Sequence, residues 1–425
     1  MIQNLAAYLD ASPSPFHAVE SATQILDANG FVECAEVDVA PSGPGQFFAR
    51  RGGSLVAWSQ PHAVSAEHPF RVVGAHTDSP NLRIKPHPDR HSHGWQSLGV
   101  EVYGGPLLTS WLDRDLGVSG RAVRRTPSGS VTELFRIDDP ILRVSQLAIH
   151  LNRDVHTEGL KLNPQQHLAP HWGLGSGPGD FHTYLADVLE VDGDDLLAWE
   201  AMTHDLTPAR VIGRDRDLLA SARLDNQATC HAALRALVES QRDTSSSAPT
   251  PVVVLFDHEE IGSTTSSGAA SPFLTGWLER IVAARGGSRE HYLRAMAATV
   301  VASADMAHAI HPNYPERHEP SHQVQMNGGP VLKVNAQGRY ASDALGEAAF
   351  ALACEQAEVP MQTYVHRTDL PCGSTVGPMT AAATGATTVD VGAATLSMHS
   401  AREVCGVADH AAYIAALAAF LAPTT

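Results

Sequence analysis

One apolar run constrains this chain more than any other part of its sequence. Residues 252–256 (VVVLF) are five consecutive apolar residues, three of them β-branched, which predicts a short strand buried on both faces of a sheet. The next four residues are Asp257, His258, Glu259 and Glu260. A solvated loop is the ordinary explanation for polar residues at a strand end. A site that uses the paired carboxylates is the alternative, and the rest of the sequence decides between them.

Helices and apolar strands alternate through the C-terminal half of the chain. Apolar residues at helical spacing in 233–238 predict a helix, and a polar loop at 241–251 leads into the apolar run. Further buried strands are expected at 71–75, 299–304 and 387–392. This alternation predicts an α/β fold whose sheet is covered by helices on both faces.

The middle of the chain has a different character. Residues 85–212 are rich in His and Pro and contain short β-like runs such as SLGVEVYGGPLL. These runs predict an inserted β-rich domain. The catalytic domain would then be discontinuous, comprising residues 1–84 and 213–425.

Composition excludes several classes of protein. The net charge is −17 and no basic block is present, which argues against nucleic acid and membrane surfaces as partners. The five cysteines are scattered and form no CxxC pair, so neither a disulfide framework nor a thiolate zinc site is expected. The sequence lacks a secretory signal pattern and any apolar stretch of about 18 residues. We therefore expect a soluble, cytoplasmic protein.

Acidic and imidazole side chains follow the predicted strands and open one predicted helix. Ligands of open α/β sheets bind at the carboxyl ends of the strands, so side chains from separate segments are expected to meet there. The candidates are His76, Asp78, Asp225, Glu259, Glu260, Asp305 and His399.

Imidazole nitrogens and carboxylate oxygens without sulfur are ligands that borderline divalent metals accept. Carboxylates packed together repel one another and raise one another's pKa, and two metal ions would neutralise them. Water held between two metals becomes a nucleophile near neutral pH, and a carboxylate outside the ligand set can take its proton. Neighbouring residues of an extended segment point in opposite directions, so Glu259 and Glu260 are expected to differ in role. The residues alone do not decide which is the ligand.

Each candidate also has an ordinary explanation when it is taken singly. Asp78 precedes a Ser-Pro pair and can form a turn, Asp225 can cap a helix, and His76 can be a buried histidine with local partners. The coincidence of five separate segments is what favours a metal site.

Longer motifs resemble the aspartyl aminopeptidase family of co-catalytic zinc exopeptidases. They occur in the family's order over nearly the whole chain, from SPSPFHAV near the N-terminus to MHSAREV near the C-terminus. Between these two lie GAHTDSPNLRIKP, RLDNQATC, DHEEIGS, SADMAHAIHPNYPERHEPSH, GGPVLKVNAQGRYAS and PCGSTVGP.

The resemblance implies a mixed-sheet zinc-exopeptidase domain with two Zn²⁺ ions per subunit, for which Co²⁺ or Mn²⁺ are expected substitutes. It implies that Glu259 is the general base and that Asp78 fixes the imidazole of His76. The metal ligands would be His76, a bridging Asp225, Glu260, Asp305 and His399.

The resemblance also implies the substrate and the assembly. Peptides with an N-terminal Asp or Glu would bind through Lys333, Tyr340 and His308, because an ammonium with hydroxyl and imidazole donors suits a carboxylate. The ordinary alternative for Lys333 is a solvated surface lysine. The family forms homododecamers, and the inserted domain would serve oligomerisation and substrate access.

His150, in the inserted domain, belongs to the active site in this family, but in one of two ways. It would be either a metal ligand or a substrate contact in a neighbouring subunit. Its place in a separate domain favours the second role, and the sequence leaves both open.

Two other functions are alternatives to this interpretation. A broader-specificity aminopeptidase or aminoacylase would use the same metals but would have no use for a cation at Lys333. An inactive metal-binding assembly protein would need the ligands but no base at Glu259.

Overall fold

The computed structural model describes residues 1–62, 64–240 and 248–424. Most of the polar loop expected before the apolar run, at 241–247, lies outside the described residues. Of the helices in these three ranges, none has both the length and the apolar composition needed to cross a bilayer.

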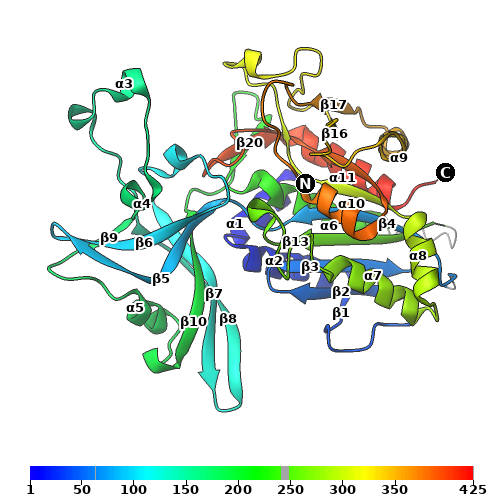
Figure 1. The fold of residues 1–425 in the computed structure, drawn as a ribbon, viewed down its shortest axis with the longest axis horizontal. Helices are drawn as coiled ribbons and strands as arrows, with labels where there is room; N and C mark the ends of the chain where they lie inside the picture. The colour runs from blue at the N-terminus through cyan, green and yellow to red at the C-terminus, as the bar shows by residue number, and fades with distance from the viewer. Residues whose placement is uncertain (63, 241–247, 425) are drawn as a thin grey trace. The chain divides into compact units, whose positions relative to one another are not determined.

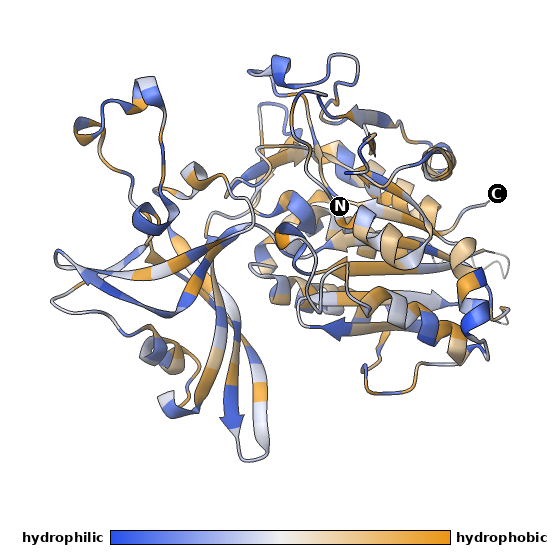
Figure 2. Ribbon diagram, in the orientation of Figure 1, coloured by the Kyte–Doolittle hydropathy of each residue, from blue (hydrophilic) through white to orange (hydrophobic). Residues whose placement is uncertain are grey.

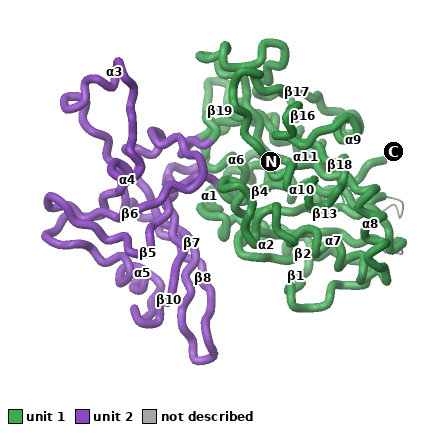
Figure 3. The backbone as a smooth tube through the Cα atoms, in the orientation of Figure 1, with its two compact units in different colours: residues 1–78, 209–398, 403–425 green, residues 79–208, 399–402 purple. Residues whose placement is uncertain are grey.

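The contacts divide the chain into two units (Figure 3). Unit 1 consists of residues 1–78, 209–398 and 403–425, and unit 2 consists of residues 79–208 and 399–402. Each unit has its own hydrophobic core.

These divisions differ from the boundaries expected after residues 84 and 212. The first strand of unit 2 already begins at Asn81, which pairs with Tyr103. Near the other boundary, the backbone N–H of Ala209 donates to the Asp10 carboxylate of unit 1 at 2.8 Å. No sequence pattern marked residues 399–402 as part of the second unit.

The main sheet of unit 1 has nine strands in the order β1-β2-β3-β13-β4-β14-β18-β16-β17 (Figure 1). Four central strands run parallel, and several outer pairs are antiparallel, so the sheet is mixed. The four central strands, each predicted from the sequence, are β13 (Thr250–Phe256), β4 (Phe70–His76), β14 (Val300–Ala304) and β18 (Thr387–Gly392). The others are β1 (Val32–Glu33), β2 (Gly45–Arg51), β3 (Ser54–Gln60), β16 (Val331–Val334) and β17 (Gln362–Val365).

Helices cover both faces of this sheet, as predicted. Side chains alternate between the faces of a strand, so Val253 and Leu255 enter one core while Val252 and Val254 enter the other. Figure 2 shows the apolar strands between the helical layers. The first core includes α1 (Ile2–Ala11), α2 (Pro15–Asp27), α6 (Leu224–Ser240), α9 (Ala344–Gln356) and α11 (Val407–Leu421). The second includes α7 (Phe273–Ala284), α8 (Arg289–Ala297) and the start of α10 (Val376–Thr384).

A smaller five-stranded sheet completes unit 1. Its strand order is β11-β12-β20-β19-β15. The strands are β11 (Arg210–Ile212), β12 (Leu218–Ser221), β20 (Glu403–Gly406), β19 (Ala394–Leu396) and β15 (Ala307–His308).

Unit 2 is built on a six-stranded antiparallel sheet in the order β8-β7-β10-β5-β6-β9. Its strands are β5 (Asn81–Ser92), β6 (Trp95–Tyr103), β7 (Leu116–Thr126), β8 (Gly129–Leu142), β9 (His171–Leu174) and β10 (Leu196–Asp205). Its helices are α3 (Val155–Glu158), α4 (Pro164–His167) and α5 (Phe181–Val188).

Candidate metal centre

The ends of three neighbouring parallel strands bring acidic and imidazole side chains together in unit 1. His76 ends β4, Asp305 directly follows β14, and the paired glutamates follow β13. Asp225 lies in the first turn of α6. Parallel strands end at the same edge of a sheet, so this convergence follows from the strand order.

His76 lies at the centre of the cluster and is only 1% exposed. Its Nε2 atom is 3.3 Å from Asp225 Oδ1, 3.5 Å from Asp305 Oδ1 and 4.0 Å from Glu259 Oε2. On the other side of the ring, Nδ1 is 3.4 Å from Asp78 Oδ1 and 3.0 Å from the Asp78 carbonyl oxygen. One imidazole therefore has four carboxylates around it.

This donor set fits a divalent metal. His76, Asp225 and Glu260 each offer a ligand atom, and these atoms lie within 4.8 Å of one another. Burial by itself lowers the pKa of His76, but Asp225, Asp305 and Asp78 together raise that pKa well above its usual value. The cluster thus favours positive charge at its centre, which a zinc ion supplies with imidazole and carboxylate ligands.

The surroundings of Glu259 shift the pKa of its carboxyl upward. Burial raises the pKa of its carboxyl to about 8; His76 opposes this shift, and Asp305, Asp78 and Asp225 add to it. A general base works best when its pKa lies near the operating pH.

The paired glutamates do not follow the extended geometry assumed from the sequence. They form a 3₁₀ turn, η4 (Glu259–Ile261), after His258, whose φ of 65° is left-handed. The Asp78 carboxylate holds the turn, because Oδ1 accepts from the Glu259 N–H and Oδ2 from the Glu260 N–H, both at 3.1 Å. The expectation of opposite side-chain directions was therefore wrong, and both glutamates reach the neighbourhood of His76.

Asp78→Ala is expected to weaken zinc binding about 10- to 100-fold, the usual cost of losing a group that orients metal ligands. The variant loses the carboxylate that supports both the His76 imidazole and the η4 turn. A competition titration with a chromophoric chelator measures the change, with the exposed Asp27→Ala as the matched control. Wild-type zinc affinity in Asp78→Ala would show that Asp78 orients nothing the metal needs.

The predicted substrate residues form a second buried group in unit 1. Lys333 in β16 is 1% exposed, so it is not the solvated lysine of the ordinary alternative. Its Nζ atom donates to the carbonyl oxygens of Asp305 at 3.0 Å and Met306 at 3.4 Å, and it lies 5.1 Å from the ring centroid of Tyr340. Burial lowers the pKa of His308 to about 4, with contributions from His366 and Lys333.

Tyr364 and His366 belong to this second group but were missed in the sequence. The Tyr364 ring lies 5.8 Å from that of His308 and 6.3 Å from that of Tyr340, and its hydroxyl is 2.6 Å from His366 Nδ1. Strand β17, which carries Tyr364, pairs in parallel with β16, and Tyr364 is the register partner of Lys333. These residues could have been found only from the register between two strands, which the sequence of a single segment does not contain.

Two predicted site residues lie in unit 2. His150 is exposed in a short 3₁₀ turn (Ile149–Leu151). His399 lies in the segment 399–402, and its Nδ1 atom is 2.9 Å from the carbonyl oxygen of Gly105. Both lie outside the residues of unit 1, and their roles stay predictions.

The comparison with known proteins decides the family. The family model described as "Aminopeptidase I zinc metalloprotease (M18)" matches residues 8–421. This chain belongs to the M18 family. It is a metal-dependent aminopeptidase, and the resemblance of its motifs is confirmed at the level of this family.

M18 relatives match along almost the whole chain. "Probable M18 family aminopeptidase 2" of Mycobacterium bovis is 54% identical over 421 residues, covering 98% of this chain and 97% of the relative. The protein of the same description from Streptomyces coelicolor is 51% identical over 422 residues, covering 99% and 97%.

Solved M18 structures share the fold. The chain matches a structure described as the cryo-EM structure of the Ape4 and Nbr1 complex with a TM-score of 0.93 and 33% identity, covering 99% of this chain and 85% of that one. It matches the S. cerevisiae mApe1 dodecamer with a TM-score of 0.85 and 26% identity, covering 98% and 95%.

Proposed function

We propose that this M18 aminopeptidase removes N-terminal Asp or Glu from peptides and uses two zinc ions per subunit. The observation that carries the acidic specificity is the buried ammonium of Lys333 beside Tyr340 and His308. An ammonium has three N–H donors, and two of them reach main-chain carbonyls. Nζ also lies 4.0 Å from Asp305 Oδ2. In this proposal the third donor turns to a substrate carboxylate, to which Tyr340 and His308 would add hydrogen bonds.

In this proposal the residues that would hold the zinc ions are His76, Asp225, Glu260, Asp305 and His399. When bound, zinc supplies Lewis acidity and lowers the pKa of its water toward neutrality.

The chain's own residues perform the proton transfers and the positioning. Glu259 takes the proton of the attacking water and later returns it to the leaving amine. Asp78 holds His76 and the η4 turn in place. The free N-terminal ammonium of the peptide would bind against acidic groups of the site, which would select an exopeptidase reaction.

A broader-specificity aminopeptidase is the alternative that the same contacts favour. If Lys333 serves only to donate hydrogen bonds to Asp305 and Met306, it supports the metal site and does not contact the side chain of the substrate.

A substrate panel separates the two functions. Peptides that begin with Asp, Glu, Ala, Leu or Lys are compared by kcat/KM, and bound metal is measured on the same preparations. We expect Asp and Glu peptides to exceed the others at least about 10-fold, in keeping with a charge-assisted contact. Equal rates would favour the broader enzyme. Full metal content without hydrolysis would favour the inactive assembly protein.

We also propose that the protein self-associates as a dodecamer and that His150 serves a neighbouring subunit. A dodecameric structural neighbour supports the assembly. The exposed apolar residues that flank His150 also support it: Leu147 is 55% exposed, Ile149 42% and Leu151 75%. A contiguous exposed apolar patch typically marks a protein interface.

His150→Ala is expected to retain its metal and to impair turnover, because the substrate would lose a contact from the neighbouring chain. Mixing this variant with inactive Glu259→Gln, under conditions that exchange subunits, should restore part of the activity. Some sites would then combine an intact Glu259 with an intact His150. The exposed His156→Ala provides the matched control. No recovery despite proven exchange would place His150 in its own chain's site, and loss of one metal would make it a ligand.

A further inference from the structure

One buried carboxylate next to the metal cluster has no role in the proposed reaction. Glu403 is the first residue of β20 and is 2% exposed. Its Oε2 atom accepts a hydrogen bond from the backbone N–H of Asp225 at 2.9 Å. A carboxylate is expensive to bury, so its place beside a proposed metal ligand calls for an explanation.

The small sheet of unit 1 delivers Glu403 to this position. Strand β20 pairs antiparallel with β12, and Glu403 is the register partner of Ser221, four positions before Asp225. The backbone is not helical at Asp225 or Asn226, with φ/ψ values of −83°/105° and −122°/22°. A buried backbone N–H outside regular helix needs another acceptor, and Glu403 accepts from that of Asp225.

A second contact ties the same segment to another strand. The Asn226 side chain donates through Nδ2 to the carbonyl oxygen of Ala304 at 2.9 Å. Ala304 ends β14 and immediately precedes Asp305. The segment is therefore bonded to β20 through Asp225 and to β14 through Asn226, and the end of β14 carries another proposed ligand.

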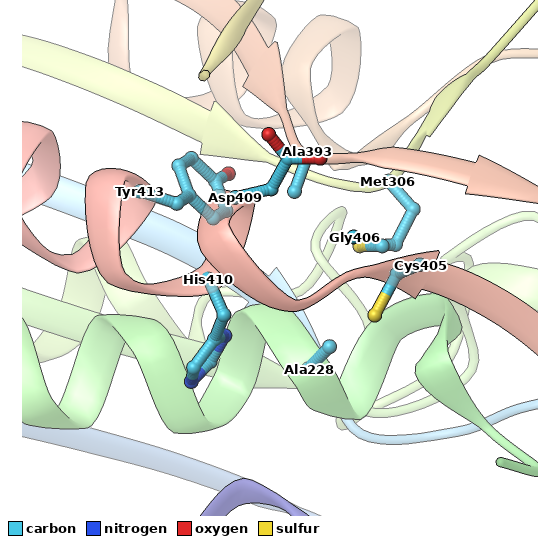
Figure 4. A pocket seen from close by; sticks show the side chains of 8 residues that line it. All are labelled: Ala228, Met306, Ala393, Cys405, Gly406, Asp409, His410 and Tyr413. Atoms are coloured by element: carbon cyan, nitrogen blue, oxygen red, sulfur yellow. The ribbon is translucent and has the colours of Figure 1, made fainter. Parts of the chain in front are cut away.

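These elements pack closely where they meet. A cavity of only about 10 Å³ lies there, and the residues that line it include Ala228 of α6, Met306 after β14, and Cys405 and Gly406 of β20 (Figure 4). This volume is about that of one water-sized sphere, so little space is left between β20 and the start of α6. The hydrogen bond from Asp225 to Glu403 is a directional contact that spans this junction.

We infer that Glu403 is a positioning residue for the metal centre, which fixes the main chain of Asp225 so that its carboxylate faces His76. This inference rests on the proposed role of Asp225 as a metal ligand. Groups that orient ligands typically contribute about 10- to 100-fold to metal affinity. The competing explanation is that Glu403 only caps α6 and stabilises the fold.

Zinc affinity and stability of the metal-free protein separate these explanations. Glu403→Ala removes the acceptor, and Glu403→Asp withdraws it by one methylene while it keeps the charge. Both are expected to weaken zinc binding about 10- to 100-fold in a chelator competition titration with zinc alone. Glu403→Gln keeps an acceptor oxygen and is expected to remain within about threefold of wild type. The control is Glu290→Ala, an exposed carboxylate in the first turn of α8.

The zinc affinity of Asp225→Asn is measured in parallel. It distinguishes failure of this inference from failure of the proposed metal site. If Asp225→Asn loses zinc while a folded Glu403→Ala or Glu403→Asp binds it like wild type, the positioning role is wrong and the proposed site stands. A lower melting temperature of the metal-free Glu403 variants with unchanged zinc affinity has the same meaning. If Asp225→Asn itself binds zinc normally, both the proposed ligand set and the inference fail.

Discussion

Glu259→Gln is expected to keep its zinc and to lose hydrolysis by about two to four orders of magnitude, the usual contribution of a general base. Glutamine has the shape of glutamate but accepts no proton at neutral pH. The Glu259 N–H still donates to Asp78 in this variant, so the η4 turn should persist. Rates on an Asp-peptide and metal content of the same preparation test both halves of the expectation.

Glu260→Gln is the informative control, because it changes the neighbouring carboxylate in the same turn. Glu260 offers a ligand atom together with His76 and Asp225, so its amide variant should lose metal as well as activity. If Glu259→Gln loses zinc instead, the two glutamates have exchanged roles. If Glu259→Gln remains active, another group is the base.

Lys333→Met is expected to lower kcat/KM for Asp and Glu peptides about 10- to 150-fold, equivalent to the roughly 1.5–3 kcal/mol of a hydrogen bond to a charged group. Methionine fills much of the space of a buried lysine, so the loss should report the charge rather than a cavity. The rate on an Ala-peptide should change far less, because that substrate carries no carboxylate for the ammonium to bind.

Because Lys333 also contacts the main chain, controls must separate substrate recognition from support of the metal site. Its Nζ atom donates to the carbonyl oxygens of Asp305 and Met306. If Lys333 only supports the metal site, its replacement would loosen that site and lower the rate on every substrate. An equal loss on Asp- and Ala-peptides, with reduced zinc content, would show this. Lys161→Met, at an exposed lysine of unit 2, should leave both rates unchanged.

The main sheet could be predicted because its signals are local. An uninterrupted apolar run such as 252–256 can be buried only between two layers. This run and three other predicted strands became the central strands β13, β4, β14 and β18. Parallel strands share one carboxyl edge, so the convergence of His76, Glu259 and Asp305 followed from the same pattern.

The direction of the paired glutamates could not be predicted in this way. Two adjacent residues diverge in a strand, but the left-handed His258 turns the chain into η4 and brings both toward His76. The Asp78 carboxylate, about 180 positions away in the sequence, accepts both N–H groups of that turn. A contact at such separation depends on how two strands lie side by side.

The sequence by itself determined the α/β architecture, the edge where the site forms, and, through its motifs, the M18 family. Burial patterns and motifs are properties of short segments, so residue propensity and hydrophobic periodicity predict them directly. Only the tertiary structure decided that Lys333 is buried against Asp305, that Tyr364 lies beside it, and that Glu403 accepts from Asp225. Each of these depends on strand register between distant segments, and a shift of one residue would turn each side chain to the opposite face.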